Sequence, residues 1–439
     1  MTNCYTGDKK VPLLKPDFLL YNSANQMSES ASKRDGIGRV TIKAGRYLWV
    51  VLPLITGAVL TQGLMRQGLP VLYPFIQNEF GLSRAQVGLI TSLLGTGSAI
   101  SAILAGWLAD TFGVKRMSTI AMLLLSIFVL SFPLAYSFPL LLGLVVLIGI
   151  VMSPIAPAIT RAVIDWFPIR IRALAMSIKQ MGVPLAGAIS AAVLPTLALA
   201  LGWRMAAAVT GLLVLIICIA FVLLYRDAPQ GTQTIHKFNL AAFKTILWNR
   251  SLMITMIWGA TFVGFQFTAL SYFMLFLIEE IELSPIMAGG LLAIAQLSSI
   301  VARVLWGAVS DFILRGQRVM VLAFTGFLTV LWMLGASLMG MGVSSITVYM
   351  ISIFMGISTL SFHGVFLTFI GEQAEPGQIG VTIGVVTMSV FVSQIVIPPL
   401  FGYLVDISSS YSLGWRTAAA VALVCTIVLL AFVREPQQR

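Results

Sequence analysis

The sequence predicts an all-α membrane protein in which twelve transmembrane helices form two pseudo-symmetric six-helix bundles. The first observation behind this prediction is a recurrence of apolar stretches from Trp49 to Phe432, each of about 20 residues, the length that crosses a bilayer as a helix. The second is that two short motifs occur once in each half of the chain, at the edges of these stretches. Such internal repeats are typical of membrane transporters, which makes a duplicated helical bundle the first hypothesis.

The composition excludes a soluble globular protein. Of the 439 residues, 58% are hydrophobic and only 10% are charged, and the mean hydropathy is +0.97. A soluble domain carries about 25% charged residues, so this chain has too little polar surface to fold in water. The sequence contains no metal-ligand spacing, no nucleotide-binding loop and no nucleophile–base motif. We therefore expect a protein without a metal or cofactor that is not an enzyme.

The apolar stretches place the spans and the domain boundaries. We expect spans over 48–76, 86–109, 117–137, 139–164, 174–200, 204–225, 252–278, 287–310, 319–340, 346–370, 380–404 and 416–433. The predicted domains are a disordered cytoplasmic tail without a signal peptide (1–45), an N-terminal bundle (46–226), a cytoplasmic linker (227–251), a C-terminal bundle (252–434) and a short cytoplasmic tail (435–439). Residues 238–247 of the linker fit either an amphipathic helix on the membrane surface or a simple tether.

The net charge of +11 arises mainly from loops on one side of the predicted membrane. The basic loops on that side contain, among others, Lys115, Arg116, Arg170, Arg172, Arg315 and Arg318, whereas the opposite loops hold Arg84, Arg204 and Arg416 together with several acids. Basic loops face the cytoplasm, so both termini are expected there, in a cell (inner) membrane of a bacterium. Since orientation accounts for the basic residues, we expect no nucleic-acid partner.

The first repeated motif closes an apolar stretch with glycine and aspartate. Gly106-Trp107-Leu108-Ala109-Asp110 is followed by Gly113 and a basic pair, and Gly307-Ala308-Val309-Ser310-Asp311 is followed by basic residues as well. Small residues let helices approach closely, and an aspartate can cap a helix or pair with an arginine. We expect these loops to act in a conformational switch, through Gly106, Asp110, Gly113, Arg116, Gly307, Asp311 and Arg315.

The second repeated motif begins an apolar stretch in each half. Gly202-Trp203-Arg204-Met205-Ala206-Ala207-Ala208-Val209 recurs as Gly414-Trp415-Arg416-Thr417-Ala418-Ala419-Ala420-Val421, with one substitution. Its position before the sixth and the twelfth predicted spans supports a duplication of six helices.

These motifs resemble the major facilitator superfamily over residues 46–434. The pattern from Gly106 to Arg116 is similar to the signature loop between helices two and three, and Gly307–Asp311 is similar to its copy between helices eight and nine. Within that superfamily the chain resembles the anion:cation symporter family, with Arg66 before Pro70 and Arg161 before Trp166-Phe167-Pro168. The resemblance implies that Arg66 and Arg161 engage an anionic substrate.

Two positions depart from that family's pattern. Many members carry an acid directly before the first arginine and another after Trp-Phe-Pro, where this chain has Met65 and Ile169. Those acids carry protons in members that use them, so the resemblance does not imply proton coupling by that route.

Four basic residues fall inside predicted spans, where a charge costs on the order of 3 kcal/mol or more. Arg66 shares a helix face with Gln62 and Tyr73, and no acid lies at its depth in the N-terminal half, which favours a substrate site over a structural ion pair. Arg161 is followed one turn later by Asp165, so an internal ion pair competes with a site role. The four are Arg66, Arg161, Lys179 and Arg303.

The remaining polar candidates lie mostly in the second half. Lys179 either joins the site or snorkels to the interface. Arg303 shares a face with Gln296 and either serves the second signature loop or contacts substrate. Helix 252–278 offers Gln266 and Tyr272 as lining groups. His363 is a candidate proton carrier, and Asp165 a second one, although a lone histidine is more often a hydrogen-bonding group.

The expected function is secondary active transport of a small organic anion, a carboxylate or sugar acid, by alternating access. The expected partners are the anionic substrate, a co-transported ion (a proton) and the lipid bilayer, with the protein acting as a monomer. An exporter of drugs or metabolites is the alternative, supported by the partial Gly182-Val183-Pro184 motif, and anion exchange also stays open. A transporter-like receptor is disfavoured because no sizeable soluble segment is present.

Overall fold

The computed structural model describes residues 41–228, 248–374 and 379–435, except for the side chains of 41–46, 103–111, 169–170, 173 and 379–381. The chain divides into two compact units, residues 1–51 and 52–439. Helix α2 (Thr41–Arg66) begins in the first unit and continues into the second, which contains every other described element. Residues 1–40 of the predicted tail lie outside the described residues, and so does the 238–247 segment, for which an amphipathic helix and a tether were both open.

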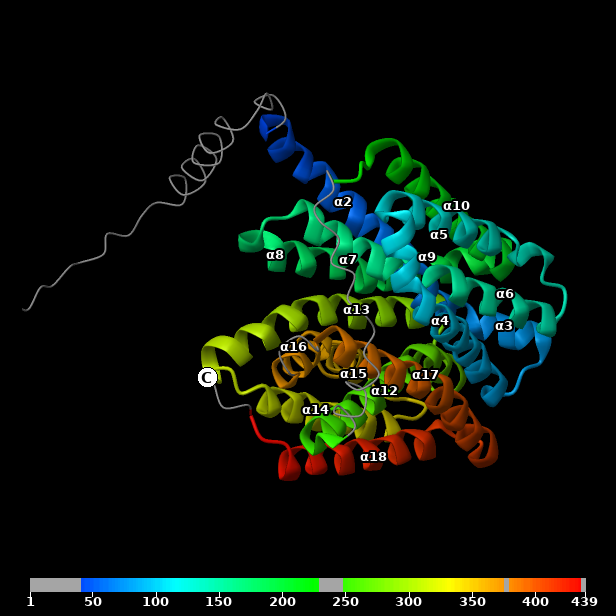
Figure 1. The fold of residues 1–439 in the computed structure, drawn as a ribbon. Coiled ribbons are helices and arrows are strands. Elements are labelled where there is room, and N and C mark those ends of the chain that lie inside the picture. Colours follow the sequence, from blue (N-terminus) through cyan, green and yellow to red (C-terminus); the bar gives the residue numbers. More distant parts are fainter. Residues whose placement is uncertain (1–40, 229–247, 375–378, 436–439) are drawn as a thin grey trace, which may run out of the picture. The chain divides into compact units, whose positions relative to one another are not determined.

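The first half of the second unit consists of helices only (Figure 1). After α2 follow η1 (Leu69–Leu72), α3 (Tyr73–Phe80), α4 (Arg84–Phe112), α5 (Val114–Leu130), η2 (Phe132–Leu134), α6 (Phe138–Met152), α7 (Ile155–Trp166), α8 (Ile169–Gln180), α9 (Gly182–Leu201) and α10 (Trp203–Leu224). Several of these join end to end into one span, as α2, η1 and α3 do.

The second half repeats this arrangement. Its elements are α12 (Arg250–Glu279), α13 (Pro285–Ala308), the π-helix η3 (Val309–Ile313), α14 (Arg318–Ser337), α15 (Ser345–Ser358), α16 (His363–Gln373), α17 (Ile379–Ser408) and α18 (Tyr411–Phe432). Among the described residues, 11 segments are long and apolar enough to cross a membrane. Helix α4, some of whose side chains are not described, occupies the place of the second predicted span. The predicted all-α, multi-span fold is confirmed.

Several spans are interrupted near their middle, and candidate residues lie at the interruptions. Arg66 is the last residue of α2, ahead of a break at Gly68 and Pro70. His363 is the first residue of α16, after the break that ends α15. Proline removes a backbone donor and interrupts a helix, and irregular backbone at membrane depth is tolerated where it is buried in protein or lines a cavity. The breaks thus bring polar groups to the interior.

Glycine allows α4 and α6 to pack backbone against backbone. A Cβ atom on Gly97 would overlap the carbonyl of Val146, and one on Gly149 would overlap the carbonyl of Leu94. Ser98 also donates a hydrogen bond to the carbonyl of Gly149 at 3.3 Å. Such close approach through small residues is the usual way in which membrane helices associate.

The two halves of the second unit meet mainly through two pairs of helices, with further contacts of α12 to η1, α3 and α4. Helix α4 packs against α17, and α9 packs against α13. A Cβ atom on Gly88 would lie 2.7 Å from the backbone of Pro399, and one on Gly289 would overlap the carbonyl of Ala191. These contacts involve the N-terminal parts of α4 and α13, which lie at the end of the bundle opposite the basic loops. We call this end the outer end.

The structure extends the sequence repeat to the helix caps. The carboxylate of Asp227, after α10, accepts a hydrogen bond from the backbone N–H of Lys115 at the start of α5 (2.9 Å). The carboxylate of Glu435, after α18, accepts one from the N–H of Val319 at the start of α14 (2.6 Å). An acid after the last helix of each half therefore caps the third helix of the same half.

The repeated Gly-Trp-Arg motif has diverged in its contacts. In the first half, the side chains of Trp203 and Arg204 both donate to the carboxylate of Glu79 at the end of α3. In the second half, Arg416 is exposed, and the neighbouring Tyr411 takes over by donating through its N–H to Glu280 (3.0 Å). The sixth helix of each half is thus bonded to the end of that half's first span, by the motif itself in the first half and by Tyr411, which precedes the motif, in the second.

Candidate functional site

Arg66 is a half-buried cation without an acidic partner among the described residues. Its guanidinium carbon lies over two aromatic rings from the other half, 5.3 Å from the ring centre of Phe267 on α12 and 5.9 Å from that of Phe391 on α17. Its Nε atom is buried and has no hydrogen-bond partner. Cation–π contacts contribute about 0.5–2 kcal/mol, less than the cost of a lone charge at membrane depth. The two ring contacts therefore do not by themselves offset the charge of Arg66.

Amide side chains with unused hydrogen-bonding atoms accompany Arg66. Four of the buried glutamines have an amide oxygen or nitrogen without a partner among the described residues: Gln67, Gln266, Gln296 and Gln394. Gln67 follows Arg66 directly, Gln266 precedes Phe267, and Gln394 lies one turn after Phe391 on the same face of α17. An amide both donates and accepts hydrogen bonds, as a hydroxyl-bearing ligand requires.

Two glycines make room for these amides. A Cβ atom on Gly187 of α9 would overlap the side-chain oxygen of Gln67 and lie 2.5 Å from the side-chain nitrogen of Gln296. A Cβ atom on Gly95 of α4 would lie 3.0 Å from the amide carbon of Gln394. The amides of Gln67 and Gln296 come from different halves and meet at Gly187.

The second half contributes another interior cation, Arg303 on α13. One of its terminal nitrogens donates to the carbonyl of Leu360 at 3.0 Å, while its Nε atom has no partner among the described residues. His363, the first residue of α16, likewise has a buried Nδ1 atom without a partner in the described part of the chain. The side chains of Arg66, Arg303 and His363 are all half-buried.

The other two basic candidates are already engaged. Arg161 pairs with Asp165 one turn later, with 3.5 Å between nitrogen and oxygen, and its side chain is 27% exposed. Lys179, which is buried, donates to the hydroxyl of Thr160 on α7 at 2.5 Å. Both lie on the span segments nearest the basic loops, away from the aromatic rings that face Arg66.

Three further candidates make hydrogen bonds within the protein. Gln62 donates to the carbonyl of Met152 at 3.2 Å and so ties α2 to α6. The hydroxyl of Tyr73 bonds that of Thr91 at 2.8 Å. The hydroxyl of Tyr272 lies 2.7 Å from the carbonyl of Arg84 and 2.9 Å from that of Pro398. Substrate contact by these three residues stays a prediction.

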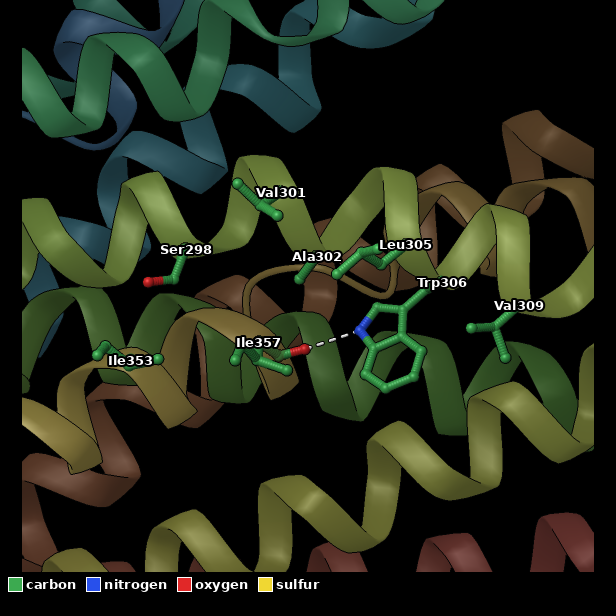
Figure 2. A pocket seen from close by; sticks show the side chains of 8 residues that line it. All are labelled: Ser298, Val301, Ala302, Leu305, Trp306, Val309, Ile353 and Ile357. Carbon is green, nitrogen blue, oxygen red and sulfur yellow. Dashed lines mark hydrogen bonds between the residues drawn. The ribbon is translucent and has the colours of Figure 1, made fainter.

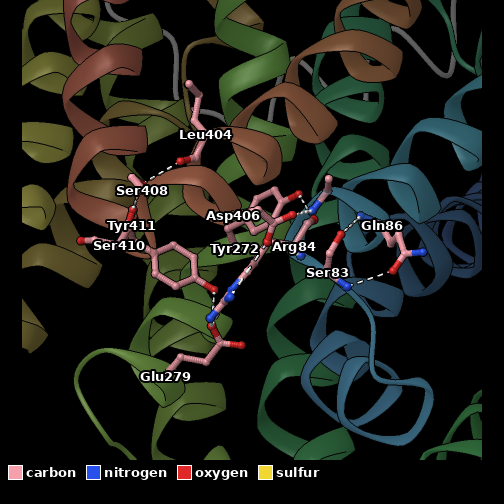
Figure 3. A network of polar contacts seen from close by, with 11 residues as sticks. Ser83, Arg84, Gln86, Tyr272, Glu279, Leu404, Asp406, Ser408, Ser410 and Tyr411 are labelled. Carbon is pink, nitrogen blue, oxygen red and sulfur yellow. Dashed lines mark hydrogen bonds and ion pairs between the residues drawn. The ribbon is translucent and has the colours of Figure 1, made fainter.

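A polar network closes the outer end between the halves (Figure 3). The two carboxylate oxygens of Asp406, on α17, accept the backbone N–H groups of Arg84 and Ala85 at the start of α4, each at 2.9 Å. The guanidinium of Arg84 pairs with Glu279 of α12 at 3.0 Å, and Tyr411 donates to the same carboxylate at 2.8 Å. We call this network, including Tyr272, the outer closure.

Sequence reasoning placed the acids of the outer closure only among the loop charges. Ser83 and Gln86 form a capping box at the start of α4. The second cap of this helix comes from Asp406 in the other half, and no sequence pattern near Arg84 indicates it. The partner of a helix end can be read from sequence only when the two lie a few residues apart.

The predicted switch loops are described in part. The side chains of Gly106 and Asp110 lie outside the described residues, Gly113 adopts a φ of +77° and Arg116 is exposed. In the second loop, Arg318 bridges Asp311 and Glu372, the latter at 3.2 Å. Arg315 has a left-handed φ of +51°, and Gly307 faces open space. Asp311 therefore pairs with an arginine, one of its two predicted roles.

An apolar pocket of about 400 Å³ lies between α13 and α15 (Figure 2). Its lining residues are Ser298, Val301, Ala302, Leu305, Trp306, Val309, Ile353 and Ile357. The indole N–H of Trp306 is bonded to the carbonyl of Ile357 at 2.8 Å and to the hydroxyl of Ser361 at 3.0 Å. With no charged group in its lining, this pocket does not suit an anion.

Helical spans joined around an interior that holds unpaired cations define a membrane transporter rather than an enzyme. Residues 55–370 match the model of the Major Facilitator Superfamily, and the chain belongs to this family. It is a multi-pass integral membrane protein that resembles the anion:cation symporters of that superfamily, as its motifs predicted.

Named relatives cover nearly the whole chain. The hexuronate transporter of Bacillus subtilis is 26% identical over 403 residues, which are 88% of this chain and 94% of that protein. The probable galactarate/D-glucarate transporter GarP of Escherichia coli is 24% identical over 428 residues, covering 89% and 96%. The probable sulfoacetate transporter SauU of Cupriavidus necator is 27% identical over 378 residues, covering 81% and 87%.

Solved structures support the fold. The nucleoside transporter NupG matches with a TM-score of 0.71 at 14% identity, covering 87% of this chain and 98% of that one. A bacterial homologue of the human lysosomal transporter Spinster, in an inward-facing conformation, matches with a TM-score of 0.68 at 18% identity, covering 88% and 96%.

Proposed function

We propose that this protein moves a hydroxylated organic anion, a sugar acid, across a bacterial cell membrane by alternating access coupled to a proton. The observation that carries the proposal is the unpaired Arg66 accompanied by glutamine amides with unused hydrogen-bonding atoms. A guanidinium presents a planar fork of donors that matches a carboxylate. The amides match the hydroxyl groups of a sugar chain.

The relatives support this substrate class by their names. They include transporters of hexuronate, of galactarate and D-glucarate, and of L-galactonate. All of these ligands combine carboxylate and hydroxyl groups, which is the chemistry that Arg66 and the glutamines can recognise.

Alternating access is supported by the uneven contacts between the halves. The outer closure joins α4 of the first half to α12 and α17 of the second through Asp406, Arg84 and Glu279. For substrate to enter from the outside, these cross-half bonds have to break while each half keeps its own packing. We infer that the described conformation is open toward the side of the basic loops.

Proton coupling is proposed to involve His363. Its Nδ1 atom has no partner among the described residues, and Arg303 bonds the carbonyl of Leu360, three residues before His363 in the chain. The positive field of that arginine opposes a second positive charge nearby. A bound anion offsets that field, so substrate and proton favour each other's binding. This route does not need the acids that many members of the symporter family carry at the positions of Met65 and Ile169.

A thermal-shift screen of the purified protein tests the anion site. A ligand that binds only the folded state raises the melting temperature, by an amount equivalent to about 2.7 kcal/mol at a hundredfold excess over Kd. We expect sugar acids to raise it and uncharged sugars not to. Arg66→Gln should lose this shift, whereas Arg416→Gln, an equal charge change at an exposed arginine, should keep it. An equal shift in Arg66→Gln would refute the assignment.

Transport assays in proteoliposomes test the proton. We expect His363→Gln to lose uptake driven by a proton gradient while it retains exchange of labelled for unlabelled anion across the membrane. Gradient-driven uptake at the wild-type rate would exclude His363 as the carrier. Failure of wild-type protein to respond to a proton gradient at all would favour anion exchange.

A further inference from the structure

We propose that the substrate is a dianion, a dicarboxylate held with one acid group on Arg66 and the other on Arg303. The inference rests on the proposed anion site and specifies which anions fit it. Its starting point is that each half of the second unit places one arginine in the interior, Arg66 at the end of α2 and Arg303 on α13. Each of the two guanidinium groups has a buried Nε atom that finds no partner in the described part of the chain.

The acids of the described residues are not available to these arginines. Nearly all of them bond groups elsewhere: Glu79, Asp165, Asp227, Glu279, Glu280, Asp311, Glu372, Asp406 and Glu435. The remaining acid with a described side chain, Glu282, is exposed between α12 and α13. Arg66 and Arg303 therefore lack a counter-charge from the described protein, and a single carboxylate would compensate only one of these two arginines. Lys179 also has no acid beside it, but it donates to the hydroxyl of Thr160 on α7.

The two arginines are connected through a pair of amides at one interface between the halves. Gln67 follows Arg66 directly, and a Cβ atom on Gly187 would meet both the side-chain oxygen of Gln67 and the side-chain nitrogen of Gln296. The amide of Gln67 belongs to the first half of the second unit, and the amide of Gln296 belongs to the second half. Gln296 lies seven residues before Arg303 on the same face of α13. A chain with hydroxyls in the middle and a carboxylate at each end matches this order of groups.

The competing explanation is that Arg303 only supports the fold. Its hydrogen bond to the carbonyl of Leu360 holds the break between α15 and α16. That bond uses one of the five N–H donors of a guanidinium. Since Nε is buried without a partner, the structural bond alone does not account for the placement of the charge.

Three six-carbon ligands separate the two explanations: gluconate and glucuronate, each with one carboxylate, and glucarate, with two. Titration calorimetry on the full-length protein should give glucarate at least about tenfold tighter binding than either monoanion, equivalent to 1.4 kcal/mol. Arg303→Gln should remove this preference and leave monoanion affinity within about twofold of wild type. Arg303→Lys should retain part of the preference for glucarate, and the control Arg416→Gln should retain all of that preference.

The outcomes distinguish this inference from the proposed function. Equal or tighter binding of the monoanions by the wild-type protein overturns the dicarboxylate assignment while leaving anion transport intact, and no variant has to fold for that result. A preference for glucarate that survives in Arg303→Gln also overturns it. If no anion binds the wild-type protein, the proposed function itself fails.

Discussion

Gly187 of α9 faces two glutamine amides that belong to opposite halves. We predict that Gly187→Ala weakens sugar-acid binding by about tenfold with little change in melting temperature. The added Cβ atom meets the ends of flexible side chains, Gln67 and Gln296, which can rotate aside and so lose the geometry that binds hydroxyls. Calorimetric titration and thermal unfolding of the same preparation measure both effects.

Gly149 of α6 supplies the matched contrast. Its added Cβ atom meets the backbone carbonyl of Leu94, which cannot move unless the helices separate. Gly149→Ala should therefore lower stability by about 1–3 kcal/mol. A Gly187→Ala protein that loses stability as Gly149→Ala does would show that the position serves packing instead of binding.

At the scale of single helices, the start of α4 is stabilised from the other half of the molecule. We predict that Asp406→Asn weakens the outer closure, because the negative charge that caps two backbone N–H groups is lost, a change of about 1 kcal/mol. A cysteine at Ser92, which bonds the carbonyl of Ile395 between α4 and α17, reports the opening. Labelling by a membrane-impermeant maleimide should rise in Asp406→Asn, in a background without native cysteines.

The control for this experiment is a cap that stays within one half. Asp227→Asn removes a similar bond, to the N–H of Lys115, but does not touch the contacts between α4 and α17. It should leave labelling at the Ser92 position unchanged. Increased labelling in both variants would indicate general loosening, and the outer closure would lose its assigned role.

At the scale of the whole molecule, the distribution of basic loops predicts orientation. We expect a fusion after Arg434 to place a partner in the cytoplasm, because Lys and Arg accumulate in loops that stay on that side. A fluorescent protein fused there should fluoresce, and a bacterial alkaline phosphatase fused there should be inactive.

A second fusion tests the opposite face. The turn that contains Gly342, between α14 and α15, should point outward, so phosphatase inserted there should be active. Active phosphatase after Arg434 would reverse the predicted topology and place the outer closure on the cytoplasmic side.

The sequence determined the multi-span helical fold by itself, since twenty-residue apolar stretches and a duplicated motif are local properties of the chain. It also identified Arg66 and Arg303 as charged residues within membrane spans, because an arginine inside an apolar stretch can be recognised from the sequence. The sequence did not predict the helix breaks inside two of the spans. Helix α2 ends at Arg66 within the predicted span 48–76, and α16 begins at His363 within the predicted span 346–370.

Only the tertiary structure decided which candidate charges are left without a partner. Arg161 has Asp165 beside it, as the spacing allowed, whereas Arg66 faces aromatic rings from segments two hundred or more positions away in the chain. Tyr73 and Tyr272, which looked like lining groups, bond Thr91 and backbone carbonyls near the outer end. The physical reason is that pairing and burial depend on contacts between distant segments, which periodicity along a single helix does not encode.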